Sequence, residues 1–395
     1  MIAVRVLVFN SGSSSLKCGV FDAGKTLIER FRGTVTGFGE DALLVWTMAG
    51  ERGEEPITAP NHAEAVAAIF TELTRRSLLE GVAAIGHRIV HGGDRFSKPV
   101  HITDTVLTQL ESINVLAPLH NPPALTVVRA CRVRFKTEPM IAVFDTAYFR
   151  ALPDYVSTYA LPREWLTAKY RIRRYGFHGI AHRCLVERYH VISGADQTSS
   201  RVISLQLGHG CSITAVRGGQ PLETSMGFTP LEGLIMATRP GDVDAGVLLN
   251  LIDSLGVTTR ELRDGLNLRS GLLGLSGVSA DMRQLLELEL KGHAGAKLAV
   301  EAFCHRARKY VGAYLAVLGG ADAIIFGGGI GEHAIEIRSR ICAGMEWCGL
   351  AMDRHANQAT VGMEGRITEL GSHVQAYVIP VDEESLIAQD TVNCL

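Results

Sequence analysis

The sequence predicts an α/β fold in two domains, and three observations support this prediction. The chain has 395 residues, whereas single domains commonly hold about 100–150 residues. Short apolar segments alternate with segments of helical periodicity, which indicates sheets covered by helices. Two similar glycine-containing turns, in 9–15 and 207–213, each join a pair of apolar segments. They suggest two related domains, although a chance likeness between two hairpins would give the same pattern.

The first part of the chain predicts strands at 4–9, 16–21, 26–31, 82–86 and 139–144, and helices at 62–79 and near 103–112 and 122–134. Residues 152–172 contain Pro153 and Pro162 and predict an irregular crossover between the domains. The second part predicts strands at 201–207, 211–217, 322–327 and 374–379, and helices near 245–255, 258–265, 279–290, 296–318 and over the last dozen residues. Thr258 and Glu261 have the spacing of a helix capping box.

The composition excludes several classes of protein. Charged residues make up 20% and hydrophobic ones 47% of the chain, which argues against disorder, and a net charge of −2 argues against a nucleic-acid partner. The eight cysteines include no C-x-x-C pair, so we expect reduced, mostly buried thiols and no zinc knuckle. The N-terminus lacks the pattern of a signal peptide, and the weakly polar run 314–331 is glycine-rich and contains Asp322. We therefore expect a cytoplasmic enzyme without a membrane segment.

Several motifs carry groups that suit phosphate or carboxylate chemistry. Residues 10–17, NSGSSSLK, form a small polar turn whose backbone N–H groups and Lys17 suit a phosphate, although an ordinary hairpin turn fits equally well. Arg88 lies in GHRIVHGG, after an apolar strand, and guanidinium pairs well with carboxylate or phosphate, although a surface arginine beside a turn is the alternative. No Walker A, G-x-S-x-G or H-E-x-x-H motif is present, which disfavours those enzyme classes.

Further polar residues follow predicted strands or glycine turns. His120 lies in a proline-rich loop, Asp145 directly follows a buried strand, and His178 is framed by glycines. Each histidine alone is more often structural than catalytic, but together these groups indicate a ligand site. The irregular stretch 223–242 adds Arg239, and FGGGIGEH at 326–333 suits a nucleotide-binding turn, with close helix–strand packing as the alternative.

Nine segments resemble the acetate kinases, within the larger class of acetate and sugar kinases, heat-shock ATPases and actin. They are VFNSGSSSLK, GHRIVHGG, APLHNPPAL, AVFDTAYF, RRYGFHGIAHR, ETSMGFTPLEGLIMATRPGDVD, SGLLGLSGVSADMR, GGGIGEH and DEESLIAQDT, in the family's order over nearly the whole chain. The resemblance implies two related actin-like domains of the ribonuclease H-like fold with an active-site cleft between them. The N-terminal domain would comprise 1–150 plus 382–395, and the nucleotide-binding C-terminal domain 151–381. It also implies a homodimer.

The resemblance further implies reversible, direct in-line transfer of the γ-phosphate of ATP to acetate, which gives ADP and acetyl phosphate, with Mg2+ or alternatively Mn2+. The implied metal-site residues are Asn10 and Glu383. The implied catalytic residues are Arg88, which also holds the acyl group, His120, Asp145, His178 and Arg239. The implied pocket for the methyl group comprises Val90, Leu119, Phe177 and Pro230. The implied nucleotide site comprises Lys17, Gln206, Leu207, Gly208, His209, Gly210, Asp281, Met282, Arg283, Gly329, Ile330, Gly331, Glu332 and His333.

The chain departs from the family pattern at three positions, and alternatives remain open. The family has H-L-G-N-G where this chain has Gln206 to Gly210 with His209, and asparagine where it has His333. These changes bear on nucleotide affinity and pH optimum, and a weakened enzyme stays an alternative. Others are a propionate or butyrate kinase, a phosphatase or polyphosphate hydrolase, and an ATP-switched binding module, for which no segment is spare. Branched Val90 favours acetate over propionate.

Overall fold

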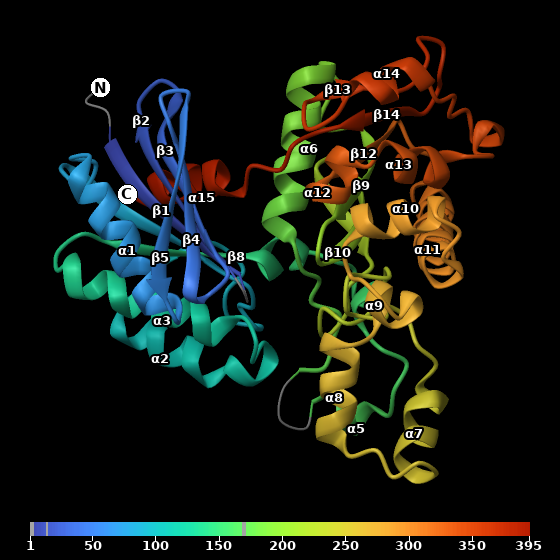
Figure 1. Cartoon of the computed structure of the whole chain (residues 1–395), viewed down its shortest axis with the longest axis horizontal. Coiled ribbons are helices and arrows are strands. Elements are labelled where there is room, and N and C mark those ends of the chain that lie inside the picture. Colours follow the sequence, from blue (N-terminus) through green and yellow to red (C-terminus); the bar gives the residue numbers. More distant parts are fainter. Residues whose placement is uncertain (1–3, 13–14, 168–170) are drawn as a thin grey trace. The chain divides into compact units, whose positions relative to one another are not determined.

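The computed structural model describes residues 4–12, 15–167 and 171–395. The chain divides into two compact units, which are described separately: Met1–Arg150 with Asp382–Leu395, and Ala151–Val381. Figure 1 shows the first unit in blue to teal, with the red helix α15, and the second in green to orange-red. Serines 13 and 14, part of the predicted phosphate turn, lie outside the described residues.

The first unit is built on an eight-stranded sheet in the order β5-β4-β3-β2-β1-β6-β8-β7. Its strands are β1 (Val4–Ser11), β2 (Ser15–Ala23), β3 (Leu27–Thr36), β4 (Gly39–Met48), β5 (Glu51–Ala59), β6 (Val82–Ile89), β7 (Val100–His101) and β8 (Met140–Phe144). Its helices are α1 (His62–Arg75), α2 (Asp104–Ser112), α3 (Asn121–Arg134) and α15 (Glu383–Asn393). Strands β1 to β5 pair antiparallel in sequence order, whereas β1, β6 and β8 run parallel. The parallel strands bring their carboxyl ends to one edge of the sheet.

Helix α15 packs against β1 and β6, although it follows the whole second unit in the sequence. Gly86 in β6 makes the close approach possible, because a Cβ there would lie 2.3 Å from Thr391 Oγ1 and 2.9 Å from Ile387 Cγ2. Its packing carries the acidic start of α15 to the end of β1.

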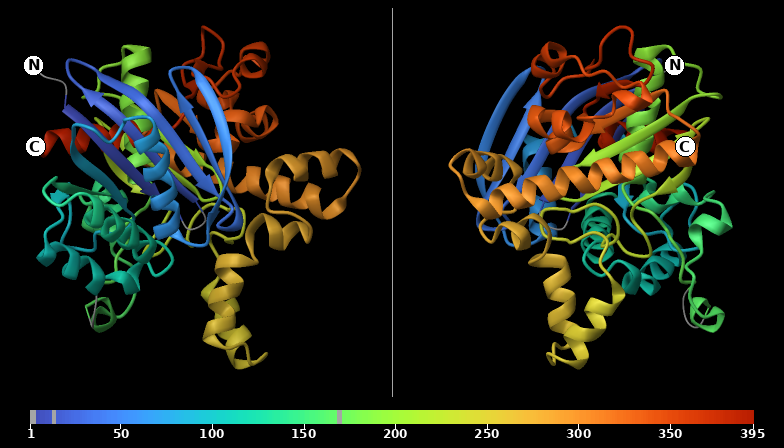
Figure 2. Two further views of the ribbon diagram at one scale, coloured as in Figure 1. Left: turned by 60° about the vertical axis from the view of Figure 1, so that its left-hand side comes forward. Right: turned by 90° about the vertical axis from the view of Figure 1, so that its right-hand side faces the viewer.

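The second unit contains a six-stranded sheet in the order β11-β10-β9-β12-β14-β13. Its strands are β9 (Arg201–Leu207), β10 (Cys211–Arg217), β11 (Gln220–Thr224), β12 (Ala323–Gly327), β13 (Gly365–Arg366) and β14 (Gln375–Val378). Its helices are α4 (Asp154–Ser157), α5 (Arg163–Leu166), α6 (Gly179–Ser193), α7 (Ala245–Asp253), α8 (Thr259–Leu268), α9 (Gly271–Ser276), α10 (Met282–Leu290), α11 (Ala294–Leu318), α12 (Gly328–His333), α13 (Ile335–Cys342) and α14 (Arg354–Ala359). Figure 2 shows α7 and α8, in yellow, projecting as an arm, and the long α11, in orange, beside the other helices.

The central part of both sheets has the same topology. The order β3-β2-β1-β6-β8 in the first unit corresponds to β11-β10-β9-β12-β14 in the second: an antiparallel hairpin pair followed by two parallel strands. Helix α6 packs on the second sheet through Leu185, Val186 and Tyr189, which join Val202 and Ile325 in one buried cluster. Both units therefore follow the hairpin-led α/β pattern that the sequence predicts.

The sequence prediction failed for several elements. Strand β3 runs to Thr36 rather than ending near 31, and β4 and β5 were not predicted because their alternating residues are charged and exposed. Helix α6 was also missed, because polar residues such as His182 and Arg183 interrupt its apolar pattern. The capping box of Thr258 and Glu261 is confirmed. In the described ranges no helix is both long and apolar enough to cross a membrane. All eight cysteines are free, and five are buried.

Candidate active site

A cluster of charged side chains lies at the carboxyl ends of the parallel strands of the first unit. Arg88, in β6, donates from Nη2 to Asp145 Oδ2 at 2.6 Å and from Nη1 to Asn10 Oδ1 at 2.9 Å. The amide nitrogen of Asn10, in β1, donates to both Glu383 Oε2 and Glu384 Oε1, each at 2.7 Å. One arginine, one amide and three carboxylates therefore form a continuous hydrogen-bonded cluster.

The turn after β6 is fixed on both sides, which positions Arg88. The Asn121 side chain accepts from the backbone N–H of His91 at 3.1 Å and donates to the His91 carbonyl at 3.0 Å. The Thr146 hydroxyl accepts from the Gly92 N–H at 3.0 Å. Asn121 and Thr146 are both buried, so each of these hydrogen bonds is shielded from water and holds the turn rigidly.

The electrostatics of the cluster keep its acids ionised. Burial raises the pKa of Glu383, but Arg88, Lys17 and the Asn10 hydrogen bond outweigh burial and leave that pKa below its usual value. Arg32 supports the neighbouring carboxylate by donating to Glu384 Oε2 at 2.6 Å. Ionised, hard oxygen ligands in a group of one or two carboxylates fit Mg2+, which otherwise keeps waters and substrate phosphates as ligands. In the part of the chain that the structure describes, no set of three His, Cys, Asp or Glu side chains has the arrangement of a closed metal site.

The other predicted residues of the first unit lie around this cluster with different exposures. Lys17 is exposed on β2, directly opposite Asn10 in the antiparallel register. His120 is the residue that precedes α3. Of the two predicted to contact the methyl group, Val90 is buried and Leu119 is about half exposed.

In the second unit, His178 and Arg239 converge on Gly210. A Cβ at Gly210 would lie 2.6 Å from Arg239 Nη2 and 3.1 Å from His178 Nε2, so only glycine leaves room for the two side chains. Burial lowers the pKa of Arg239, and its Nη1 donates to the Pro230 carbonyl at 2.9 Å. His178 has a left-handed backbone, with φ of 58° and ψ of 29°, just before α6. Such a conformation in a residue other than glycine is strained and is typical of functional sites.

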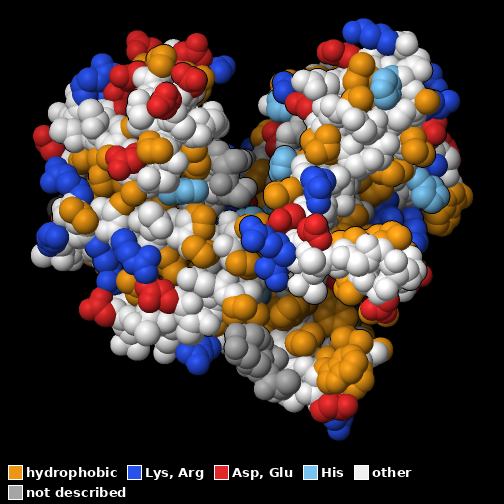
Figure 3. All heavy atoms as spheres, turned by 60° about the horizontal axis from the view of Figure 1, so that its bottom comes forward, with side chains coloured by type: hydrophobic (Ala, Val, Ile, Leu, Met, Phe, Trp, Pro, Cys, Tyr) orange, Lys and Arg blue, Asp and Glu red, His pale blue; other side chains and the backbone are white. Residues whose placement is uncertain are grey.

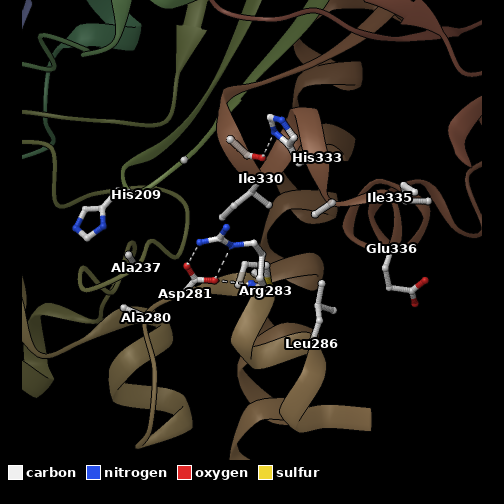
Figure 4. A pocket seen from close by; sticks show the side chains of 14 residues that line it. His209, Ala237, Ala280, Asp281, Arg283, Leu286, Ile330, His333, Ile335 and Glu336 are labelled. Carbon is white, nitrogen blue, oxygen red and sulfur yellow. Dashed lines mark hydrogen bonds and ion pairs between the residues drawn. The ribbon is translucent and has the colours of Figure 1, made fainter. Parts of the chain in front are cut away.

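A pocket of about 830 Å3 lies in the same unit, a size suited to a small ligand such as a nucleoside. It is lined by the predicted Gly208, His209, Asp281, Met282, Arg283, Gly329, Ile330 and His333, and also by Ala237, Ala280, Leu286, Ala334, Ile335 and Glu336. Figure 4 shows three segments around it, with Arg283 folded over Asp281, to which its Nη2 donates at 2.9 Å. The structure therefore brings together the three segments that the resemblance assigned to the nucleotide.

The remaining predicted nucleotide residues support the edge of this pocket. Glu332 Oε1 accepts from the Gly328 N–H at 2.8 Å and from the Val381 N–H at 3.1 Å, so it braces α12 instead of facing the pocket. Gly331 is buried, as are Leu207 and Phe177. Gln206 Oε1 is buried and has no hydrogen-bond partner among the described residues. His209 lines the pocket, and burial and then the charge of Arg239 lower its pKa.

Sequence reasoning missed several residues that hold this site. Glu384 and Arg32 complete the acidic cluster, and the double acid in DEES was the available signal for Glu384. Ser212 and His182 contact His178 through hydrogen bonds, and the pair His178 and His182 at helical spacing was the signal there. Nothing in the sequence pattern indicated Arg338, which is fully buried and donates to the carbonyls of Gly331 and Glu332.

Two α/β units of equivalent topology, a nucleotide-sized pocket and an arginine–carboxylate cluster are the features of a phosphotransferase. The chain belongs to the acetokinase family, whose model matches residues 5–389. It is 45% identical to the acetate kinase of Solibacter usitatus over 99% of this chain and 98% of that protein.

Two solved structures resemble it along almost their whole lengths. The acetate kinase of Porphyromonas gingivalis has a TM-score of 0.90 at 39% identity, covering 99% of both chains. A propionate kinase of Francisella tularensis has a TM-score of 0.92 at 37% identity, covering 99% of this chain and 100% of that one.

Proposed function

We propose that this protein is an acetate kinase, which transfers the γ-phosphoryl group of ATP reversibly and directly to acetate and gives ADP and acetyl phosphate. The observation that carries the proposal is the pocket of the second unit, whose lining comes from the three segments expected to bind nucleotide. The family to which the chain belongs supports acetate as the acceptor.

The proposed reaction requires positioning and charge neutralisation more than covalent chemistry. His178 and Arg239 meet at Gly210, next to the pocket residues Gly208 and His209, and we assign to them the oxygens of the transferring phosphoryl group. A cation in this role contributes about 10³–10⁵ in rate in other phosphotransferases. We assign the acetate carboxylate to Arg88.

We assign a Mg2+ site, in which Mn2+ could substitute, to Glu383 with Asn10, and extend it to Glu384. Bound there, Mg2+ would neutralise phosphate charge. In the structure the Asn10 amide nitrogen lies between the two glutamates and its oxygen accepts from Arg88. Asn10 therefore orients both carboxylates and the arginine.

Asp145 is assigned an orienting role. A carboxylic acid such as acetic acid titrates near pH 4.3, about as glutamate does, so at neutral pH the acceptor oxygen carries no proton for a base to remove. Asp145 instead holds Arg88 through Nε and Nη2. We propose that it orients the arginine and the waters of the bound metal.

Chain-length selectivity is assigned to Val90, Leu119, Phe177 and Pro230. Branched Val90 and the ring of Phe177 are both buried, so they have little room to move for a longer acyl chain. We therefore expect acetate to be preferred to propionate, and butyrate to be poor. Propionate kinase activity is the second candidate, because a propionate kinase is among the structures that match over the full chain.

A second copy of this chain is the proposed partner. Helix α7 has the sequence AGVLLNLID and no buried residue. Figure 2 shows it on the projecting arm, and Figure 3 shows hydrophobic side chains gathered at this end of the molecule. Val247 is 49% and Leu249 61% exposed. An exposed apolar helix of this kind marks a protein interface, and we propose a homodimer.

The function is tested by mixing the purified protein with Mg-ATP, hydroxylamine and acetate, propionate or butyrate in separate reactions. Hydroxylamine traps an acyl phosphate as a hydroxamate. Acetohydroxamate forming fastest is the expected result, whereas propionohydroxamate forming fastest would favour the second candidate. Phosphate released without hydroxamate from any acid would contradict the proposal and indicate a phosphatase. ATP binding without turnover would indicate a binding module or a protein that has lost activity.

A further inference from the structure

A chain of hydrogen bonds leads from His178 into the buried sheet of the second unit. His178 Nδ1 lies 2.9 Å from Ser212 Oγ, and the same hydroxyl lies 2.7 Å from His182 Nε2. His182 Nδ1 lies 2.9 Å from Ser204 Oγ. Ser204, Ser212 and His182 have no exposed surface. The four side chains therefore form one buried line that ends at the imidazole beside Gly210.

The fold fixes the ends of this line. Ser204 and Ser212 lie on β9 and β10, which are paired in antiparallel register. His178 precedes α6 and His182 lies in its first turn, where the His182 N–H donates to the His178 carbonyl at 2.9 Å. The two histidines therefore lie one helical turn apart on the same face and can share one serine.

Counting hydrogens shows what the line can do. Burial lowers the pKa of His182 to about 3, so this ring is neutral and carries a single N–H. If Nε2 carries it, His182 donates to Ser212, and Ser212 then donates its only hydrogen to His178 Nδ1. A neutral His178 in that state carries its hydrogen on Nε2, the atom that lies against Gly210 and Arg239.

We propose that Ser212 and His182 are positioning residues that hold His178 with Nε2–H directed at the transferring phosphoryl group. This inference rests on the proposed function. An Nε2–H donor stabilises phosphoryl oxygens without adding a second positive charge next to Arg239. The opposite order of hydrogens places the Nε2 lone pair there, which would repel those oxygens.

The first test compares Ser212→Ala with Thr214→Val. Thr214 lies on the same strand, is equally buried, and pairs with Thr224 Oγ1 at 3.1 Å, so its variant controls for the loss of a buried hydroxyl. We expect Ser212→Ala to lower kcat roughly 10- to 100-fold, the general scale of one positioned proton donor, with KM for ATP and acetate changed less than about twofold. Ser212→Thr, which keeps a hydroxyl, should recover part of kcat, and Thr214→Val should retain it.

The second test reads the tautomer directly. Side-chain 15N NMR of the histidines, with ADP and inorganic phosphate present and His178 identified by a His178→Gln variant, should show His178 as the neutral Nε2–H form. In Ser212→Ala the Nδ1–H form should become populated. A wild-type Nδ1–H form, an unchanged spectrum in Ser212→Ala, or an equal loss of kcat in Thr214→Val would overturn the proposal. If the wild type made no acyl phosphate, the proposed function would fail, while the NMR result would still decide the hydrogen-bond arrangement.

Discussion

Asp145 and Arg88 form an ion pair with a distance of 2.6 Å between Oδ2 and Nη2, although the Asp145 side chain has no exposed surface. A buried carboxylate in contact with a guanidinium is expensive to break, because loss of one partner leaves the other charge uncompensated. The same arginine also contacts Asn10, and lies 3.8 Å from Glu383 Oε2. Changes at Asp145 should therefore reach the whole acidic cluster.

We expect Asp145→Asn to lower kcat by about 10²–10³, the scale of losing one preorganised electrostatic contact. Because no proton needs removing from acetate, the loss should be similar from pH 6 to 8.5, and the Mg2+ concentration for half-maximal activity should rise. Steady-state kinetics over pH and Mg2+ measure both. Asp94→Asn, which weakens a longer 3.4 Å contact with Arg150 at the surface, is the control. A loss confined to low pH with unchanged Mg2+ dependence would instead identify Asp145 as a general base.

His209 should couple ATP binding to pH. Burial and Arg239 lower its pKa, so it is neutral above pH 6.5 and takes a proton only as the pH falls further. A cationic His209 attracts phosphate, so KM for ATP should fall between pH 7.5 and 5.5 in the wild type relative to His209→Asn. The ratio of the two KM values at each pH cancels the protonation of ATP itself. A ratio that is constant over this range would show that His209 does not contact the phosphates.

His87 should make the first unit sensitive to acid. It is buried in β6 and stacks on Phe9 at 5.9 Å between ring centroids, and burial and then Arg132 lower its pKa to about 3. Below pH 6.5 the unfolded chain takes a proton that the native state refuses, so stability is lost as pH falls toward 3. The slope is about 1.4 kcal/mol per pH unit for each such group.

Urea unfolding of His87→Phe between pH 7.5 and 4.5 tests this expectation. The variant should lose less stability on acidification than the wild type. His355→Phe, at an exposed position, should keep the wild-type slope. Equal slopes in all three proteins would mean that His87 is not held neutral in the native state.

Arg338 should be required for both stability and the shape of the nucleotide pocket. It is fully buried and donates to Asn357 Oδ1 at 2.7 Å, to the Thr360 carbonyl at 2.7 Å and to the carbonyls of Gly331 and Glu332. Arg338→Met leaves these acceptors without a donor, and several such losses at about 1–3 kcal/mol each predict severe destabilisation.

Arg338→Lys keeps the charge and some donors, so it should fold and raise KM for ATP more than it lowers kcat. The control is Arg340→Gln, because Arg340 pairs with Glu289 and Glu336 at the partly exposed surface and should contribute only about 0–1 kcal/mol per pair. Urea unfolding and ATP titration measure both effects. An Arg338→Met protein with wild-type stability would show that water replaces the guanidinium without cost.

Leu249 should be necessary for dimer formation. Leu249→Asp places a charge on the exposed apolar helix α7 and is expected to give a monomer by light scattering at micromolar concentration. Leu370, which is 88% exposed, provides the matched control Leu370→Asp, which should stay dimeric. A monomeric wild type, or a dimeric Leu249→Asp, would exclude α7 as the interface.

The sequence identified the parts of the site that lie inside single motifs. Asn10, Arg88 and Asp145 each follow or end an apolar strand, and parallel strands bring such ends together, so their meeting was predictable. The contact of Arg32 with Glu384 was not, because the two residues are 352 positions apart and meet only through the packing of α15. The line from Ser204 to His178 likewise depends on the register of β9 and β10, which no single motif encodes.

The position of α15 has a consequence for biosynthesis. Glu383 and Glu384 complete the cluster of the first unit, yet the ribosome adds them only after the whole of residues 151–381. During translation, where domains made first tend to fold first, the nascent first unit has Arg88 and Asp145 but lacks both glutamates and the helix that covers β1 and β6. The enzyme therefore cannot assemble its acidic cluster on a half-made chain, and chains that stop before residue 383 lack it altogether.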